Sequence, residues 1–379
     1  MNSFNIDALL ADPSIRIIVC TGAGGVGKTT TAAALGVRAA EMGRNVCVLT
    51  IDPARRLAQA MGLTELDNTP RPVHGVSGGS LNAMMLDMKR TFDEVVESHA
   101  DPERAQQILS NPFYQALSSS FAGTQEYMAM EKLGQLHNNT TDWDLIIVDT
   151  PPSRNALDFL DAPARLGSFL DGRFIRILTA PARGAGNALG RIAALGFGIF
   201  TNVLSKILGA QVLADIGTFV AAIDTTFGGF RERADATYAL LKQPGTQFLV
   251  VAAPERDALR EASFFVERLQ RDSMPLAGLV LNRVQDVTET GLSEEQIAAA
   301  AQLLRESSDS DDGTAMTAAL LELHAERMQI KARQKHLIQR FEGAHPGVPI
   351  ISVPAMPEDI HDLDGLRSVG SALAEHTSW

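Results

Sequence analysis

Short apolar runs recur along the chain, and most of the segments between them show helical spacing. Runs of this kind are typical of strands that are buried on both faces of a sheet. Strands that alternate with helices indicate an α/β fold, and we predict a doubly wound, mostly parallel sheet. The predicted strands are 15–20, 45–51, 81–88, 143–148, 246–252, 276–281 and 348–353, and the predicted helices are 28–42, 91–137, 254–271, 314–341 and one closing helix in the tail.

The first predicted strand leads into a glycine-rich segment that ends where a helix begins. The segment from Gly22 to Thr29 fits the pattern G-x-x-x-x-G-K-[ST], in the strand–loop–helix setting that a phosphate-binding loop requires. Glycines let backbone N–H groups approach a polyphosphate, and the helix N-terminus favours anions. Lys28 supplies a positive charge for the β- and γ-phosphates, and the Thr29 hydroxyl is the expected Mg²⁺ ligand. We therefore expect a fold of the P-loop NTPase type rather than an ordinary glycine-rich turn.

Two carboxylates follow predicted strands, where ligand chemistry is found in open α/β sheets. Asp52 follows the second strand and is a candidate for orienting the attacking water or a Mg²⁺-bound water. The alternative for Asp52 is a helix N-cap before Pro53. Asp149 ends an apolar run in a Walker B arrangement, in which the carboxylate holds the Mg²⁺ hydration shell opposite Thr29. The segment 150–155 is a candidate switch that senses the γ-phosphate.

Long helical stretches interrupt the alternation of strands and helices. Residues 185–223 are apolar at most positions, and the protein's own core, a partner subunit or a bound hydrophobic client could cover them. Residues 285–313 are acidic and polar, and we expect a mobile surface insertion there. The expected division is a P-loop ATPase domain of residues 1–90, 141–156 and 243–379, with an inserted helical subdomain of residues 91–140 and 157–242.

Composition narrows the classes of protein. The chain has 379 residues, of which 45% are hydrophobic, enough for one large domain or two average ones. A net charge of −12 argues against non-specific nucleic-acid binding. The two cysteines, Cys20 and Cys47, lie in predicted strands and outside any C-x-x-C pattern, so we expect neither a disulfide framework nor a cysteine zinc site. The first residues lack the pattern of a signal peptide, and we expect a cytoplasmic protein, with peripheral membrane contact as a further expectation.

Several segments together resemble one family. They are the phosphate loop, IDPARRLAQAMG after the second strand, DTPPSRNALDFLDAP from Asp149, LVLNR at 279–283 and VPAMPEDIHDL near the end. They resemble the ArsA-type ATPases, which are arsenite-pump ATPases and the ATPases of guided entry of tail-anchored membrane proteins. These belong to a wider dimerising P-loop class with the nitrogenase iron protein and the MinD/ParA proteins. The resemblance extends over nearly the whole chain and is strongest to a cysteine-free bacterial branch, particularly its actinobacterial members.

The resemblance implies a role for each matching residue. Asn282 would pair with the adenine edge, since Asn offers both a donor and an acceptor, and Pro354 with Met356 would pack near the base. A turn residue at a strand end is the alternative for Asn282. Thr29 and Asp149 would hold Mg²⁺, and Asp52 and Lys28 would be catalytic. The residues expected to bind ATP or ADP are Gly22, Ala23, Gly24, Gly25, Val26, Gly27, Lys28, Thr29, Thr30, Asn282, Arg283, Pro354 and Met356.

The chain departs from the family pattern in three places. The family's loop usually reads G-K-G-G-x-G-K-[ST], and its first Lys reaches the nucleotide of the other subunit, whereas this chain has Ala23 there. We therefore expect either slow ATP hydrolysis in a homodimer or a heterodimer with a paralogue that carries the Lys, and we favour the heterodimer. Residues 285–330 lack the cysteines that hold zinc or arsenite, so no such site is expected. The usual P-T-G-H after the Walker B Thr is replaced by residues 152–155, so the switch chemistry is expected to differ.

The leading hypothesis is an ATP-binding and ATP-hydrolysing, Mg²⁺-dependent switch. Its helical subdomain would handle a hydrophobic client or a membrane-associated partner. The alternative is a nucleotide-stabilised structural subunit of a heterodimer with little turnover of its own, which Ala23 favours. A metabolic kinase is a third reading, but the sequence shows no recognisable acceptor pocket.

Overall fold

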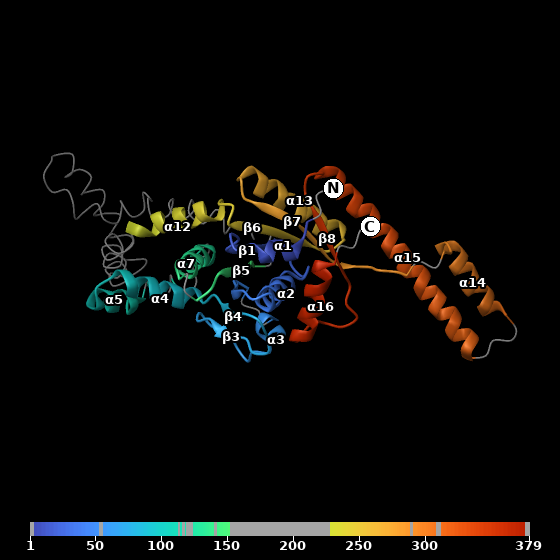
Figure 1. Cartoon of the computed structure of the whole chain (residues 1–379), viewed down its shortest axis with the longest axis horizontal. Helices are drawn as coiled ribbons and strands as arrows, with labels where there is room; N and C mark the ends of the chain where they lie inside the picture. The colour runs from blue at the N-terminus through green and yellow to red at the C-terminus, as the bar shows by residue number, and fades with distance from the viewer. Residues whose placement is uncertain are drawn as a thin grey trace, which may run out of the picture.

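The computed structural model describes residues 4–52, 56–112, 114–115, 118, 124–139, 142–151, 228–288, 291–307 and 312–375. In this part of the chain a sheet runs through the middle of the molecule, with helices on both of its faces (Figure 1). The strands are β1 Ile17–Gly22, β2 Asn45–Thr50, β3 Arg71–Pro72, β4 Ser80–Met85, β5 Leu145–Asp149, β6 Thr246–Ala252, β7 Leu276–Val284 and β8 Ile350–Pro354. The helices are α1 Ile6–Ala11, α2 Lys28–Glu41, α3 Arg56–Ala60, α4 Met88–His99, α5 Pro102–Leu109, α7 Thr124–Asn138, α12 Gly228–Leu241, α13 Arg256–Arg271, α14 Glu294–Glu306, α15 Asp312–Ala344 and α16 Leu363–Ala374.

The sheet has eight strands in the order β3-β4-β2-β5-β1-β6-β7-β8. Every neighbouring pair is parallel except β3 and β4. β1 therefore lies between β5 and β6, well inside the sheet, and the carboxyl ends of the parallel strands share one edge. The predicted α/β fold with a mostly parallel sheet is confirmed.

Both faces of the sheet are covered, as a doubly wound fold requires. Successive side chains of β1 alternate between two core clusters: Ile17 and Val19 belong to one, and Ile18 and Cys20 to the other. The first cluster includes buried residues of α4, α7, α13 and the end of α15, and the second includes those of α1, α2, α3 and α16. Each face of the sheet packs on helices. This explains why the predicted strands are runs of apolar residues rather than alternating apolar and polar ones.

The start of the chain is fastened by a buried arginine that the sequence analysis did not single out. Arg44 donates to the carbonyl oxygens of Leu10 (3.0 Å), Asp12 (3.0 Å), Ile15 (2.9 Å) and Asp144 (2.8 Å). Its Nε also forms a 2.7 Å ion pair with the Asp144 carboxylate. One guanidinium thus supplies hydrogen-bond donors to backbone carbonyl groups at the end of α1 and in the segments that enter β1 and β5. The sequence analysis did not predict α1, which is too short for helical periodicity.

Part of the stretch 285–313, which was expected to be a mobile surface insertion, is a regular helix. Residues 294–306 form the helix α14, which packs along α15. Ser293 begins it with a capping box, because the Ser293 side chain accepts from the Gln296 N–H and the Gln296 side chain accepts from the Ser293 N–H. An acidic, polar composition hid a helix whose buried face is narrow, with only Ile297 and Ala301 buried.

Other boundaries differ from the prediction in smaller ways. β4 ends at Met85 rather than at residue 88, because Asp87 caps α4 by accepting from the Arg90 N–H. The stretch 91–137 was predicted to be mainly helical, with breaks at Pro102, Pro112 and Gly123. Its helices are α4, α5 and α7, and Pro102 begins α5 as a first-turn proline. The short strand β3 lies inside the stretch 64–80, which was predicted to be a loop.

Some expectations lie outside the described residues. The apolar stretch 185–223, most of the candidate switch 150–155 and Pro53 belong to this group. The division into a P-loop domain and a helical subdomain stays a prediction; the described helices α4 and α7 share one core cluster with the strands. Cys20 and Cys47 are buried and free, as expected. Within the described part of the chain, the helices are all too short or too polar to cross a bilayer.

Candidate functional site

Three glycines of the motif, Gly22, Gly25 and Gly27, have a positive φ that residues with a side chain rarely adopt. Gly22 has a φ of 153°, and a Cβ there would lie 2.0 Å from the carbonyl oxygen of Val251 on β6. Gly27, the N-cap of α2, has a φ of 95°, and a Cβ there would lie 2.1 Å from the Asn282 side-chain nitrogen. The glycines of the motif therefore let the loop pack against β6 and β7. The phosphate-loop pattern has the strand–loop–helix context that it requires.

The lysine of the motif lies over its own loop. Lys28 is only 5% exposed, and its Nζ donates to the carbonyl oxygen of Ala23 at 2.7 Å. Burial lowers the pKa of Lys28, while the carboxylates of Asp149 and Asp52 act in the opposite direction. α2 begins at Lys28 and has no side-chain cap at its N-terminus, where the helix dipole favours an anion.

Asp149 is the most buried charged group of the site, at 0% exposure. Its Oδ2 accepts from the hydroxyl of Thr29 at 2.8 Å and from the hydroxyl of Thr50 at 2.9 Å. Its Oδ1 is buried and has no hydrogen-bond partner among the residues that the structure describes. Burial raises the pKa of Asp149 to about 6, although the two hydroxyls oppose that shift. A buried carboxylate oxygen without a donor, beside a threonine hydroxyl, fits a divalent cation or its bound water.

Thr50 is a site residue that the sequence analysis missed. Its hydroxyl donates to Asp149 and accepts from the backbone N–H of Asp52 at 3.2 Å. Thr50 therefore links the two carboxylates that were predicted to be functional. Its position gave the only signal: it is the last residue of β2 and the only residue of the run 46–50 with a hydroxyl.

Asp52 lies just beyond the end of β2 and lines the same cavity as Lys28 and Thr29. The alternative role, a helix N-cap before Pro53, is not tested, because residues 53–55 lie outside the described part and α3 begins at Arg56. The Asp52 carboxylate is therefore next to the phosphate loop, as the sequence predicts.

β7 and β8 form the other wall of the site. The β7–β8 pairing is irregular between Leu281 and Val284, and Arg283 within this bulge has a left-handed φ of 61°. Asn282 donates from its side-chain nitrogen to the carbonyl oxygen of Val26 at 2.9 Å. The amide of Asn282 thus holds the phosphate loop, a contact that the sequence analysis did not assign to it.

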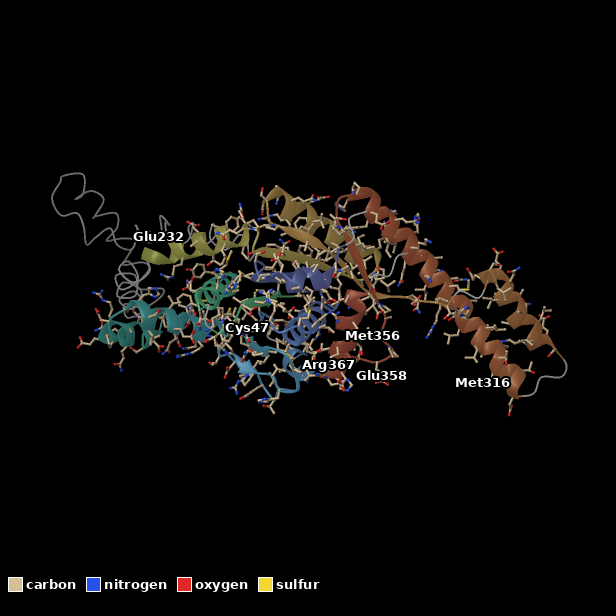
Figure 2. The ribbon with its side chains drawn as sticks, in the orientation of Figure 1. Cys47, Glu232, Met316, Met356, Glu358 and Arg367 are labelled. Carbon is tan, nitrogen blue, oxygen red and sulfur yellow. The ribbon has the colours of Figure 1, made fainter. Side chains whose placement is uncertain are left out.

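These walls enclose a cavity of about 700 Å³. Met356 lines it from the segment between β8 and α16, near Glu358 (Figure 2). The predicted residues that line the cavity are Gly25, Gly27, Lys28, Thr29, Thr30, Asp52, Asn282, Arg283 and Met356. The predicted residues that are not among its lining are Gly22, Ala23, Gly24, Val26, Asp149 and Pro354. Lining residues that the sequence analysis did not propose include Arg56, Gln59, Glu358, Asp359 and His361.

A strand, a glycine-rich loop and a helix that present Lys28 and Thr29 beside a buried strand-end carboxylate define a P-loop nucleotide-binding protein. A family model described as anion-transporting ATPase matches residues 15–299, and the chain belongs to this family. The resemblance stated from the sequence is confirmed, although the chain does contain two cysteines. The protein is therefore an ATPase that binds ATP and hydrolyses it.

Curated relatives agree with this assignment. The chain is 26% identical over 377 residues to "ATPase get3" of Schizosaccharomyces pombe, covering 98% of this chain and 94% of the relative. It is 31% identical over 158 residues to "ATPase GET3" of Malassezia globosa, covering 42% and 45% of the two chains. It is also 31% identical over 156 residues to "Arsenical pump-driving ATPase" of Escherichia coli, covering 40% of this chain and 26% of that one.

The position of Thr50 generates a prediction about Thr50→Val. The substitution removes one of two donors to the Asp149 carboxylate and the acceptor of the Asp52 N–H. We expect kcat for ATP hydrolysis to fall about 10- to 100-fold, because a partner that orients a cation-binding carboxylate is lost. The free energy of unfolding should fall by about 1–2 kcal/mol. Steady-state turnover across a Mg²⁺ titration and urea unfolding measure the two effects.

Thr21→Val is the matched control. Thr21 is also buried, in β1 on the other side of β5, but its hydroxyl has no hydrogen-bond partner in the described part of the chain. Turnover and stability should therefore change little. Wild-type turnover in Thr50→Val would contradict the role given to Thr50.

Proposed function

We propose that this ATPase is a Mg²⁺-dependent switch whose helical part handles a hydrophobic client or a membrane-associated partner. The dependence on Mg²⁺ is proposed from the cluster of Thr29, Asp149 and Thr50. The Oδ1 atom of Asp149 is buried there and has no hydrogen-bond donor in the described part of the chain. A bound Mg²⁺ would supply neutralisation of the charge that develops between the β- and γ-phosphates.

Each residue of the site has a role in this proposal. The backbone N–H groups of residues 22–30 bind the phosphates, and Lys28 exchanges its bond to the Ala23 carbonyl for one to a phosphate oxygen. The Thr29 hydroxyl is a Mg²⁺ ligand, and Asp149 holds the bound waters. Asp52 orients the attacking water, which is supported by the bond from its N–H to Thr50. On the base side, Met356, Asn282 and Arg283 line the cavity where the adenine binds. Pro354 ends β8 two residues before Met356 and supports the same wall from outside the lining.

The partner is proposed from position 23. Ala23 is nearly buried, at 8% exposure, and offers only its carbonyl oxygen to Lys28. It cannot place a positive charge on a second nucleotide, so a subunit of this kind lacks one cation for the transition state. We therefore keep the heterodimer with a paralogue that carries the Lys as the preferred assembly, and the homodimer as its alternative.

The client-handling part rests on how the site continues along the chain. Asp149 ends β5, and the hydroxyl of the next residue, Thr150, donates to the Cys20 carbonyl oxygen at 2.9 Å. The chain then enters the segment that contains the apolar residues 185–223. The apolar stretch begins 36 residues after Asp149 in the same connection, between β5 and α12, so the segment that leaves the site leads to it.

The nucleotide site is tested with Lys28→Ala and Asp52→Asn. We expect Lys28→Ala to weaken Mg²⁺–ADP binding about 100-fold, because a buried charged contact is lost. We expect Asp52→Asn to bind normally but to turn over about 100-fold or more slowly, because only the water loses its orienting group. Titration calorimetry and phosphate release measure the two quantities, with Glu342→Gln on α15 as a remote carboxylate control. Calorimetry that detects no heat of binding in folded wild-type protein, alone or with its companion subunit, would reject the site.

The missing cation is tested with Ala23→Lys, which restores the family's loop pattern. In a homodimer the new ammonium reaches the second nucleotide, so we expect kcat to rise about tenfold or more. Ala23→Met is the control, because it adds a side chain of similar length without a charge. If isolated wild-type protein already turns over as fast as Ala23→Lys, no cation is missing and the heterodimer is unnecessary.

The switch is tested by hydrogen exchange in Mg²⁺–ADP and in a Mg²⁺-bound, non-hydrolysable ATP analogue. We expect amide protection in residues 91–140 and 157–242 to differ between the two nucleotides, since the proposal couples these residues to Asp149. Lys28→Ala should show no such difference. Equal exchange of these residues in both nucleotide states of the wild type would remove the switch from the proposal and leave the ATPase.

A further inference from the structure

Arg56 lines the nucleotide cavity, and the proposed function gives it no role. It is the first residue of α3, and it shares the cavity with Lys28, Thr29 and Asp52. Arg56 is exposed, and it has no hydrogen bond or ion pair with any residue that the structure describes. A guanidinium that no carboxylate holds is available to a ligand in the same cavity.

The position of Asp52 shows which end of the cavity Arg56 lines. Burial has the largest effect on the pKa of Lys28 and of Asp149, and the charge of Asp52 also acts on the pKa of both groups. Asp52 therefore lies at the end of the cavity that receives the terminal phosphate in the proposed function. Arg56 follows Asp52 by four residues and lines the cavity from the same side, together with Gln59 of α3.

The charges that line the cavity leave few cations for a triphosphate. Among the described lining residues, the lysines and arginines are Lys28, Arg56 and Arg283, and the acidic residues are Asp52, Glu358 and Asp359. Arg283 belongs to the bulge of β7, on the side that is proposed for the base. Lys28 and Arg56 are therefore the two lining cations on the side of the phosphates.

The γ-phosphate is the part of ATP that most needs a second cation. In the proposed site the N–H groups of residues 22–30 and Lys28 bind the phosphates, and Thr29 holds the cation between the β- and γ-phosphates. The oxygens of the γ-phosphate that face Asp52 have no positive partner in this arrangement. An arginine suits this place, because its planar fork can donate to two phosphate oxygens at once.

We propose that Arg56 binds the γ-phosphate of ATP and makes the site prefer ATP to ADP. ADP lacks the phosphate that Arg56 holds, whereas the contacts to the base and to the β-phosphate are open to both nucleotides. The contact forms within one chain, so it is the same in a homodimer and in a heterodimer, and it does not replace the cation that is missing at position 23. The inference rests on the nucleotide site of the proposed function.

Titration calorimetry of the full chain, with Mg²⁺–ADP and with Mg²⁺-bound β,γ-imido ATP, tests this preference. We expect Arg56→Gln to weaken binding of the ATP analogue about tenfold or more and to change ADP binding less than about twofold, because a charged hydrogen-bonding pair is lost only with the triphosphate. Arg56→Lys should keep part of the preference, since it keeps the charge without the fork. Arg56→Gln that binds the analogue as the wild type does, or that weakens both nucleotides equally, would overturn the proposal.

Gln59→Ala is the matched control, because it changes a second exposed lining residue of α3 without changing the charge. It should bind both nucleotides as the wild type does. Circular dichroism verifies that the variants are folded. A wild-type protein that binds neither nucleotide would reject the nucleotide site itself, so failure of the proposed function is distinguishable from failure of this inference alone.

Glu358→Gln with Asp359→Asn tests whether Arg56 acts through the carboxylates of the cavity instead. If Arg56 binds the γ-phosphate, this double variant keeps or increases the preference for the ATP analogue, because it removes negative charge near the triphosphate. Arg56→Gln then has the same effect in this background as in the wild type. A double variant that loses the preference as Arg56→Gln does would show that the arginine acts on these carboxylates, which contradicts the proposal.

Discussion

The hydrogen bonds to the buried carboxylate of Asp149 connect more of this protein than any other contact of the site. Asp149 ends β5, Thr50 ends β2, and Thr29 lies in the first turn of α2, so one carboxylate joins two strands and the helix that follows the phosphate loop. The N–H of Ile51 adds a backbone bond to the Asp149 carbonyl at 2.9 Å. Because every partner is buried or partly buried, this cluster sets where the loop, Asp52 and a bound cation can lie.

The sheet topology supplies the rest of that positioning. β1 has β5 on one side and β6 on the other, so the loop that leaves β1 passes between two fixed walls. On the β6 side Gly22 lies so close to β6 that a methyl group would not fit, and Asn282 of β7, the next strand on that side, holds the Val26 carbonyl. The bulge at Arg283 is located where the chain must leave the regular β7–β8 pairing to approach the loop. The geometry of the loop is therefore a property of four strands and not of the glycine motif alone.

The sequence predicted what depends on local pattern and missed what depends on contact across the sheet. The strands were visible because both of their faces are apolar. Lys28 and Thr29 were visible because their spacing within one motif is fixed, and Asp149 because it ends an apolar run. Thr50 and the loop contact of Asn282 were missed, since their partners are 99 and 256 residues away along the chain. α14 was missed for a different reason: its helix-start signal was present in Ser293 and Gln296, but its acidic composition was given more weight.

The buried charged groups of the site also lower the stability of the fold when no ligand is bound. Asp149 is fully buried with one oxygen lacking a donor in the described part, and its raised pKa reports that its charged form is disfavoured there. Lys28 is buried against a carbonyl oxygen rather than against a full negative charge. Under the proposed function, Mg²⁺ and a triphosphate provide the missing opposite charges for both groups. The fold therefore keeps a locally unfavourable arrangement that its ligand relieves, and nucleotide binding and stability are coupled through the same two side chains.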